Sequence, residues 1–314
     1  MKIRYLLYGV AIGLVPLAYV MIFASGSNVL RLEATSFSDS AGIFSKSVTS
    51  VTPPNSAYLF GKKIPLENWE VRERFEREFY YNYVNSDQLI LWYKRLKRWE
   101  KMIDSSLDAN NLDRDLKYLM VAESGVRNVE SPAKANGFWQ FIPPTGQRWG
   151  LRVDESIDER LDPAKSTAAA MRYLIKLKNQ FASDYFLAVA SYNMSEDNVD
   201  LVLDYQHQSS YWNIFVNEET MRYVLRIAVI KELLEHGSRY GLRFESVTPY
   251  LPWNIKYLTV TGPIESIADW AKTNGFSYKD IKVYNPWLIA RSIPQGQFEI
   301  AVPATNEART TVLP

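Results

Sequence analysis

The sequence has no cysteine, only two histidines and almost no net charge. Without cysteine, disulfides, thiolate zinc sites and lipid-modified cysteines are excluded. Neither His207 nor His236 has a second histidine or an acidic cluster at ligand spacing. A Ser-His-Asp hydrolase or a histidine-metal enzyme is therefore not expected, and we predict neither a metal nor a cofactor. A net charge of +1 gives no support for nucleic acid as a partner.

Aromatic residues, by contrast, are plentiful at 14% of the chain. They suit stacking against sugars, although aromatic side chains are first of all core residues. A length of 314 residues allows one good core and a small second domain.

The N-terminus suggests export. Residues 1–26 have a basic start and the apolar run Tyr5–Ala24, which just reaches the ~20 residues of a bilayer span. A cleaved signal peptide usually has a shorter apolar region, of ~7–15 residues, although Ala24–Gly26 loosely resembles a cleavage site. We favour an uncleaved anchor with its basic end inside. Residues 27–63 are rich in Ser and Thr without a sustained period, which predicts a flexible linker.

A carboxylate in an apolar stripe is the first candidate for chemistry. Leu112, Leu116 and Leu119 recur at intervals of four and three, and Glu123 follows on the same helix face. Gly125 then predicts the end of the helix. At a helix C-terminus, the backbone dipole and partial burial both raise the pKa of a carboxyl group. Glu123 is therefore suited to act as a general acid.

Residues 137–143 form an aromatic segment that could wall a groove and present Gln140 as an amide donor and acceptor. The alternative for Gln140 is a structural amide. Most glycosidases use two carboxylates, ~5–9.5 Å apart. The candidates for a partner of Glu123 are Glu130, Asp154, Asp158 and Glu219, and the sequence does not choose among them.

Four motifs together resemble one enzyme family. They are Glu123-Ser124-Gly125, Gly137-Phe138-Trp139-Gln140, Ser191-Tyr192-Asn193, and Glu219-Thr220 with Tyr223-Val224. In this order and spacing they resemble the lytic transglycosylases of the goose-type-lysozyme-like group. The resemblance covers roughly residues 64–244 and implies a mainly α fold, with a lysozyme-like helical catalytic domain over residues 64–250.

The resemblance also implies a reaction and a partner. In this family a single glutamic acid, here Glu123, acts first as acid and then as base on peptidoglycan glycan strands. The bond cleaved is the β-1,4 bond between N-acetylmuramic acid and N-acetylglucosamine. The 6-hydroxyl of the muramic acid attacks its own anomeric carbon and forms a 1,6-anhydro end without water.

Roles for six further residues follow from the same resemblance. Ser124 would hold the glutamate or the substrate, or else be a capping hydroxyl. Gln140, Tyr192 and Asn193 would contact the sugar in the cleft. Glu219 would bind the N-acetyl group or be a surface acid, and Tyr223 would orient Glu123 or simply pack in the core.

One segment departs from the family pattern. Where small residues and glycine usually follow the Tyr-Asn pair, this chain has Met194-Ser195-Glu196-Asp197. Glycine adopts positive φ without cost, whereas Met and Ser do not. We therefore expect the loop after Asn193 to differ.

A second, weaker resemblance covers residues 251–304. The predicted order strand–helix–helix–strand is similar to a LysM domain, a small α+β module that binds N-acetylglucosamine-containing glycans. The usual Gly-Asp-Thr-Leu turn is replaced by Gly262-Pro263-Ile264-Glu265, so the fold is expected while glycan binding stays open. Residues 305–314 are read as a tail.

The leading hypothesis is an exported lytic transglycosylase of the cell envelope, periplasmic and held in the inner membrane by its N-terminal segment. The alternatives are a lysozyme-like hydrolase, in which water replaces the internal hydroxyl, and a non-catalytic peptidoglycan-binding tether.

Overall fold

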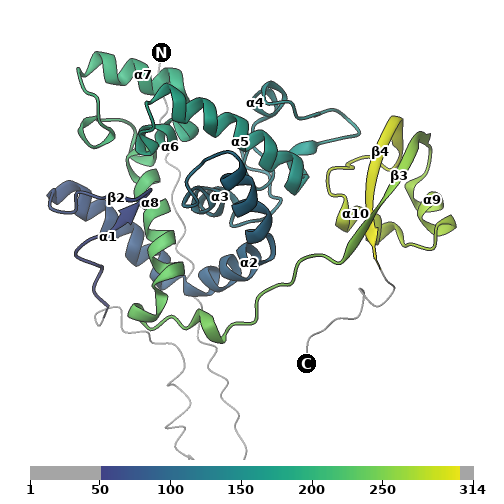
Figure 1. Cartoon of the computed structure of the whole chain (residues 1–314), viewed down its shortest axis with the longest axis horizontal. Coiled ribbons are helices and arrows are strands. Elements are labelled where there is room, and N and C mark those ends of the chain that lie inside the picture. The colour runs from purple at the N-terminus through teal and green to yellow at the C-terminus, as the bar shows by residue number, and fades with distance from the viewer. Residues whose placement is uncertain (1–50, 305–314) are drawn as a thin grey trace, which may run out of the picture. The chain divides into compact units, whose positions relative to one another are not determined.

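A computed structural model describes residues 51–304 of the protein (Figure 1). The predicted anchor at residues 1–26, the linker up to residue 50 and the tail at residues 305–314 lie outside the described residues. Between residues 51 and 304, no helix is both long and apolar enough to cross a membrane.

The last part of the predicted linker belongs to the folded domain. Strand β1 (Tyr58–Leu59) pairs antiparallel with β2 (Lys62–Lys63), and Leu59 is completely buried. The Phe60 N–H donates a hydrogen bond of 2.8 Å to Asp115 Oδ2. The prediction of a flexible linker as far as residue 63 is therefore wrong for this hairpin, whose apolar side chains are buried by partners distant in sequence.

Two long helices open the main domain. Helix α1 (Trp69–Val84) buries Val71, Phe75 and Phe79, the residues that the four-residue spacing placed on one face. Helix α2 (Ser86–Ala109) follows after a single residue and buries a similar apolar face. Both helices thus bury the face on which apolar residues recur every three or four positions.

Helix α3 (Leu116–Ser124) is the central element of this domain. Seven of its nine residues are buried, and it packs against α2 and α8 (Glu218–Glu235). Helices α5 (Pro163–Gln180) and α6 (Tyr185–Met194) complete the surrounding layer (Figure 1). Because α3 is enclosed by other helices, its C-terminal end is held rigidly.

Shorter elements join these helices. They are α4 (Pro143–Arg148), η2 (Glu159–Leu161), α7 (Glu196–Tyr205), η3 (Tyr211–Asn213), η4 (Gly237–Tyr240) and η5 (Phe244–Ser246). Helix α7 buries Glu196 and Val199, and Val202 and Leu203 of the same helix pack partly buried against the main core.

The C-terminal domain has the predicted strand–helix–helix–strand order. Strand β3 (Ile255–Ile264) pairs antiparallel with β4 (Ile293–Pro303), and α9 (Ile267–Thr273) and α10 (Tyr278–Tyr284) lie between them in the chain. Its core includes Ile267, Ile281 and Ile300, all completely buried. The small α+β fold expected from the sequence is therefore present.

Candidate active site

Glu123 lies in the last turn of α3, one residue before the helix ends. Gly125 ends the helix in the left-handed conformation, with φ 58° and ψ 32°. A Cβ at this position would overlap the indole of Trp92, so both the backbone angle and the close packing require glycine. The predicted helix stop is confirmed, and it fixes where the Glu123 side chain begins.

The carboxyl group of Glu123 is partly buried and accepts a short hydrogen bond from the Tyr223 hydroxyl of α8. Burial raises the pKa of Glu123 to about 7, and the charge of Glu219 acts in the same direction. The hydrogen bond from Tyr223 and the positive charge of Arg226 oppose this rise. A carboxyl group with this pKa exchanges its proton near neutral pH, as an acid that later becomes a base must do.

Ser124 does not reach the glutamate. Its side chain is buried, and its hydroxyl donates to the carbonyl oxygen of Phe138 at 2.9 Å. The same Oγ accepts from the Arg127 N–H at 3.4 Å. Ser124 therefore ties the end of α3 to the segment before Gln140, and its hydroxyl is engaged within the protein.

Gln140 is held in the left-handed region at φ 49°. Its Nε2 donates to Val129 O at 2.9 Å and to Gly137 O at 2.8 Å. Both amide hydrogens have partners within the protein, so the structural alternative holds for the NH₂ group. The carbonyl Oε1 is the part of the amide that a ligand in the cleft could engage.

A buried ion pair supports the segment that carries Gln140, residues 134–142, which we call the Gln140 loop. Arg160 donates to Lys134 O at 2.7 Å and to Phe141 O at 2.9 Å, and its charge is matched by Asp158. Both ionic side chains are at most 7% exposed. The predicted wall is therefore built from Gln140 and Phe141, whereas Trp139 is completely buried.

The end of α6 also lines the cleft, next to the Gln140 loop. The Tyr192 hydroxyl donates to the carbonyl oxygen of Trp139 at 2.7 Å. Asn193 Oδ1 accepts from the Thr220 hydroxyl at 2.7 Å, which links α6 to the start of α8. Burial raises the pKa of Tyr192, and the negative charge of Glu123 adds to the rise, so the phenol stays protonated.

The turn after Asn193, residues 194–196, which we call the Ser195 corner, is the segment that we expect to differ from the family pattern. Ser195 adopts φ 76° and ψ 149°, and its hydroxyl caps α7 by accepting from the Asn198 N–H. The chain therefore keeps a positive φ although no glycine is present.

Six of the seven predicted site residues line one cleft of about 760 Å³: Glu123, Gln140, Tyr192, Asn193, Glu219 and Tyr223. Ser124 does not line it. Arg226 also lines the cleft and was missed, because a basic residue on a helix usually indicates a solvated face.

The four carboxylates considered as partners for Glu123 are separated by the fold. Glu219 alone of the four lines the cleft. Glu130 pairs with Lys134 at 2.8 Å on the surface, and Asp158 is occupied by Arg160. Asp154 pairs with Arg152. Over residues 51–304 we also find no group of His, Asp and Glu side chains that could hold a metal ion.

Comparison with known proteins agrees with this geometry. Residues 101–215 match the transglycosylase SLT domain, and residues 256–306 match the soluble lytic transglycosylase C-terminal LysM-like domain. Over 246 residues, or 76% of this chain, the sequence is 26% identical to membrane-bound lytic murein transglycosylase D of Escherichia coli (strain K12). The protein of the same name from Escherichia coli O6:H1 gives the same values. The aligned region is 53% of each relative, so the chain spans about half the length of the curated relatives it matches.

Proposed function

The chain carries a transglycosylase SLT domain followed by a LysM-like domain, and from this we propose that it is a lytic transglycosylase of peptidoglycan. The observation that carries the proposal is the environment of Glu123. Its carboxyl group has a pKa of about 7, is bonded to Tyr223 and faces a cleft large enough for sugar units.

The reaction needs one acid and no external nucleophile. Glu123 donates its proton to the glycosidic oxygen as the bond from the anomeric carbon of N-acetylmuramic acid to that oxygen breaks. The 6-hydroxyl of the same sugar then attacks the anomeric carbon, and its proton returns to Glu123. Atoms balance without water, and the product is a 1,6-anhydromuramoyl end. An internal hydroxyl is favoured because intramolecular attack avoids a large entropic cost.

The other cleft residues position the sugar. Tyr223 orients the Glu123 carboxyl group through their hydrogen bond. The exposed Glu219 is assigned to the N-acetyl group, whose amide N–H can donate to a carboxylate. Tyr192, Asn193 and the Oε1 atom of Gln140 complete the contacts along the cleft.

We assign this activity to the cell envelope on the basis of the segments that flank the catalytic domain. The LysM-like domain is assigned to glycan binding, despite its altered turn at Gly262-Pro263-Ile264-Glu265. The N-terminal apolar segment, residues 1–26, is assigned to anchoring in the inner membrane, with the folded part in the periplasm.

Digestion of purified sacculi by the full chain, followed by mass analysis of the fragments, tests the reaction. We expect anhydro-ended muropeptides, and Glu123→Gln should lower their rate of formation by about 10²–10⁴-fold or more. Glu130→Gln, an exposed glutamate, should leave the rate unchanged.

The outcomes separate the three hypotheses. Fragments heavier by one water would indicate the lysozyme-like hydrolase instead. Binding to sacculi without soluble fragments would indicate the tether. Full activity of Glu123→Gln would refute the assignment of the acid.

A further inference from the structure

Arg226 is the one basic side chain that lines the cleft among the described residues. It lies on α8, three residues after Tyr223, and its side chain is 25% exposed. The other charged groups that line the cleft are Glu123 and Glu219. A cation at this place needs an explanation, because cleaving a glycosidic bond develops positive charge at the sugar.

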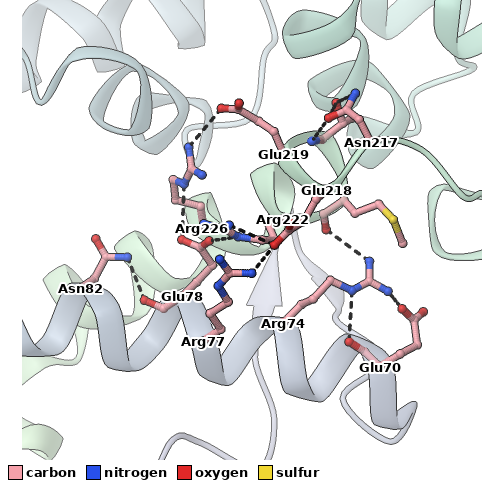
Figure 2. Close-up of polar contacts among 12 residues, drawn as sticks. Glu70, Arg74, Arg77, Glu78, Asn82, Asn217, Glu218, Glu219, Arg222 and Arg226 are labelled. Carbon is pink, nitrogen blue, oxygen red and sulfur yellow. Dashed lines mark hydrogen bonds and ion pairs between the residues drawn. The ribbon is translucent and has the colours of Figure 1, made fainter. Parts of the chain in front are cut away.

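Arg226 is fixed from behind by Glu78 of α1. Its Nε donates to Glu78 Oε2 at 3.3 Å, and Glu78 is only 1% exposed. Figure 2 shows Arg226 between Glu78 on one side and Glu219 on the other. The guanidinium is therefore anchored at one end, while its terminal nitrogens remain on the side of the cleft.

The contact on the cleft side is loose. Arg226 Nη1 lies 3.8 Å from Glu219 Oε1, beyond hydrogen-bond distance, and the Glu219 side chain is 66% exposed. No hydrogen bond joins the Nη atoms of Arg226 to any other residue between 51 and 304. A carboxylate from a ligand could replace Glu219 at these nitrogens and form the shorter, bidentate pair that guanidinium groups favour.

We propose that Arg226, backed by Glu78, is an anion subsite that binds a carboxylate of the glycan substrate. The inference rests on the proposed function for the choice of ligand. N-acetylmuramic acid carries a lactyl group that ends either in a free carboxylate or in a peptide, and such a peptide carries carboxylates of its own. Arg226 thereby selects for muramoyl-containing strands over neutral glycans.

Arg222 provides a matched control on the same helix. It also pairs with Glu78, with Nε 2.6 Å from Oε1 (Figure 2). Arg222 does not line the cleft. Removing either arginine leaves Glu78 with one cationic partner, so similar effects on folding are expected. Only the removal of Arg226 should change the preference for charged over uncharged substrate.

The test compares solubilised glycan strands with the same strands after their carboxylates have been capped as methylamides. For the unaltered full chain, we expect kcat/KM to be about tenfold or more lower on the capped strands, since a charged hydrogen-bond pair is lost. Arg226→Gln should cut both preparations at the same slow rate, with the loss mainly in KM. Arg222→Gln should keep the preference, and Arg226→Lys should restore part of it.

Equal rates of the unaltered chain on both preparations would overturn the proposal, as would a preference that survives in Arg226→Gln. Calorimetric binding of both preparations to Glu123→Gln separates this proposal from the function. Suppose that neither the unaltered chain nor any variant cuts either preparation, but that the charged strands bind more tightly and lose this advantage when Arg226 is replaced. The assignment of the reaction then fails, and the anion subsite stands.

Discussion

The Gln140 loop and the Ser195 corner line the same cleft but are held by different kinds of interactions. The loop is fixed by the buried guanidinium of Arg160, which bonds two of its carbonyl oxygens and pairs with Asp158. The corner turns through Ser195 at φ 76°, whose hydroxyl accepts from the Asn198 N–H at 3.4 Å. The next residue, Glu196, is a buried carboxylate that accepts from the Tyr173 hydroxyl at 2.9 Å and pairs with Lys176. The loop is therefore held through a buried cation, and the corner through a buried anion beside a residue in an unfavourable backbone conformation.

This difference indicates what each wall does. The loop must hold Gln140 in an unusual backbone conformation with both amide hydrogens engaged, which needs rigid support. At the corner, Ser195 ends α6 and caps α7, and its side chain has only the cap bond to Asn198. We expect substitutions in the support of the loop to have large effects, and substitutions of Ser195 to have small ones.

The largest effect is expected for Arg160→Met. It should lower the free energy of unfolding by about 3–5 kcal/mol, because Asp158 would stay buried without its partner. Denaturant unfolding of the full chain measures this. Arg152→Met is the matched control, since its pair with Asp154 is about 40% exposed and should contribute at most about 1 kcal/mol. Equal losses for the two variants would show that the buried pair does not fix the loop.

A second, smaller loss is expected for Gly137→Ala within the loop. Gly137 has φ 79°, and a Cβ would run into the backbone oxygen of Arg160. We expect a loss of about 2–4 kcal/mol from the backbone conformation and the overlap together. Gly241→Ala isolates the first contribution, because Gly241 has φ 76° with no atom within 4 Å of the added Cβ. Denaturant unfolding measures both losses. If the two variants lose the same free energy of unfolding, the close approach of residue 137 to Arg160 does not contribute to the loss.

The sequence was informative where its signals were local. The apolar spacing and Gly125 placed Glu123 at the end of α3, because helix periodicity and helix ends depend on neighbouring residues. The order of elements in the C-terminal domain followed from short strand and turn signals in the same way.

Features that depend on distant residues could not be predicted. Arg226 belongs to the site only because Glu78, on another helix, is buried beside it. The β1–β2 hairpin is tied to the start of α3 by the hydrogen bond from the Phe60 N–H to Asp115, 55 residues further along the chain. Ser195 shows the converse case, in which a local preference for glycine is overridden by the packing of α6 and α7.

Glu123 lines the same cleft as the loop and the corner, and its ionisation links activity to stability. The folded chain keeps its proton up to about pH 7, whereas an unfolded glutamate loses it near pH 4.5. The stability from this group is therefore fully present below pH 4.5 and is lost as the pH rises to about 7. Glu123→Gln cannot ionise, so it should gain about 1–2 kcal/mol relative to the unaltered chain between pH 5 and pH 8.

Denaturation at both pH values measures this gain, with Glu130→Gln as the exposed control. The activity of the unaltered chain should fall as the pH rises above 7, because proton donation needs the acid form of Glu123. A stability difference between Glu123→Gln and the unaltered chain that does not vary with pH would contradict the buried acid.

The smallest effect, and the one stabilising change in the walls, is expected for Ser195→Gly. Glycine adopts φ 76° without the cost of about 1 kcal/mol or more that a serine bears there. The lost cap on α7 offsets only a few tenths of this. Ser210→Gly is the control, since Ser210 caps the η3 turn from an ordinary φ of −128° and should lose stability. Changes of opposite sign in the free energy of unfolding would show that the backbone strain is located at Ser195. Two equal losses would mean that the backbone of the corner is not strained.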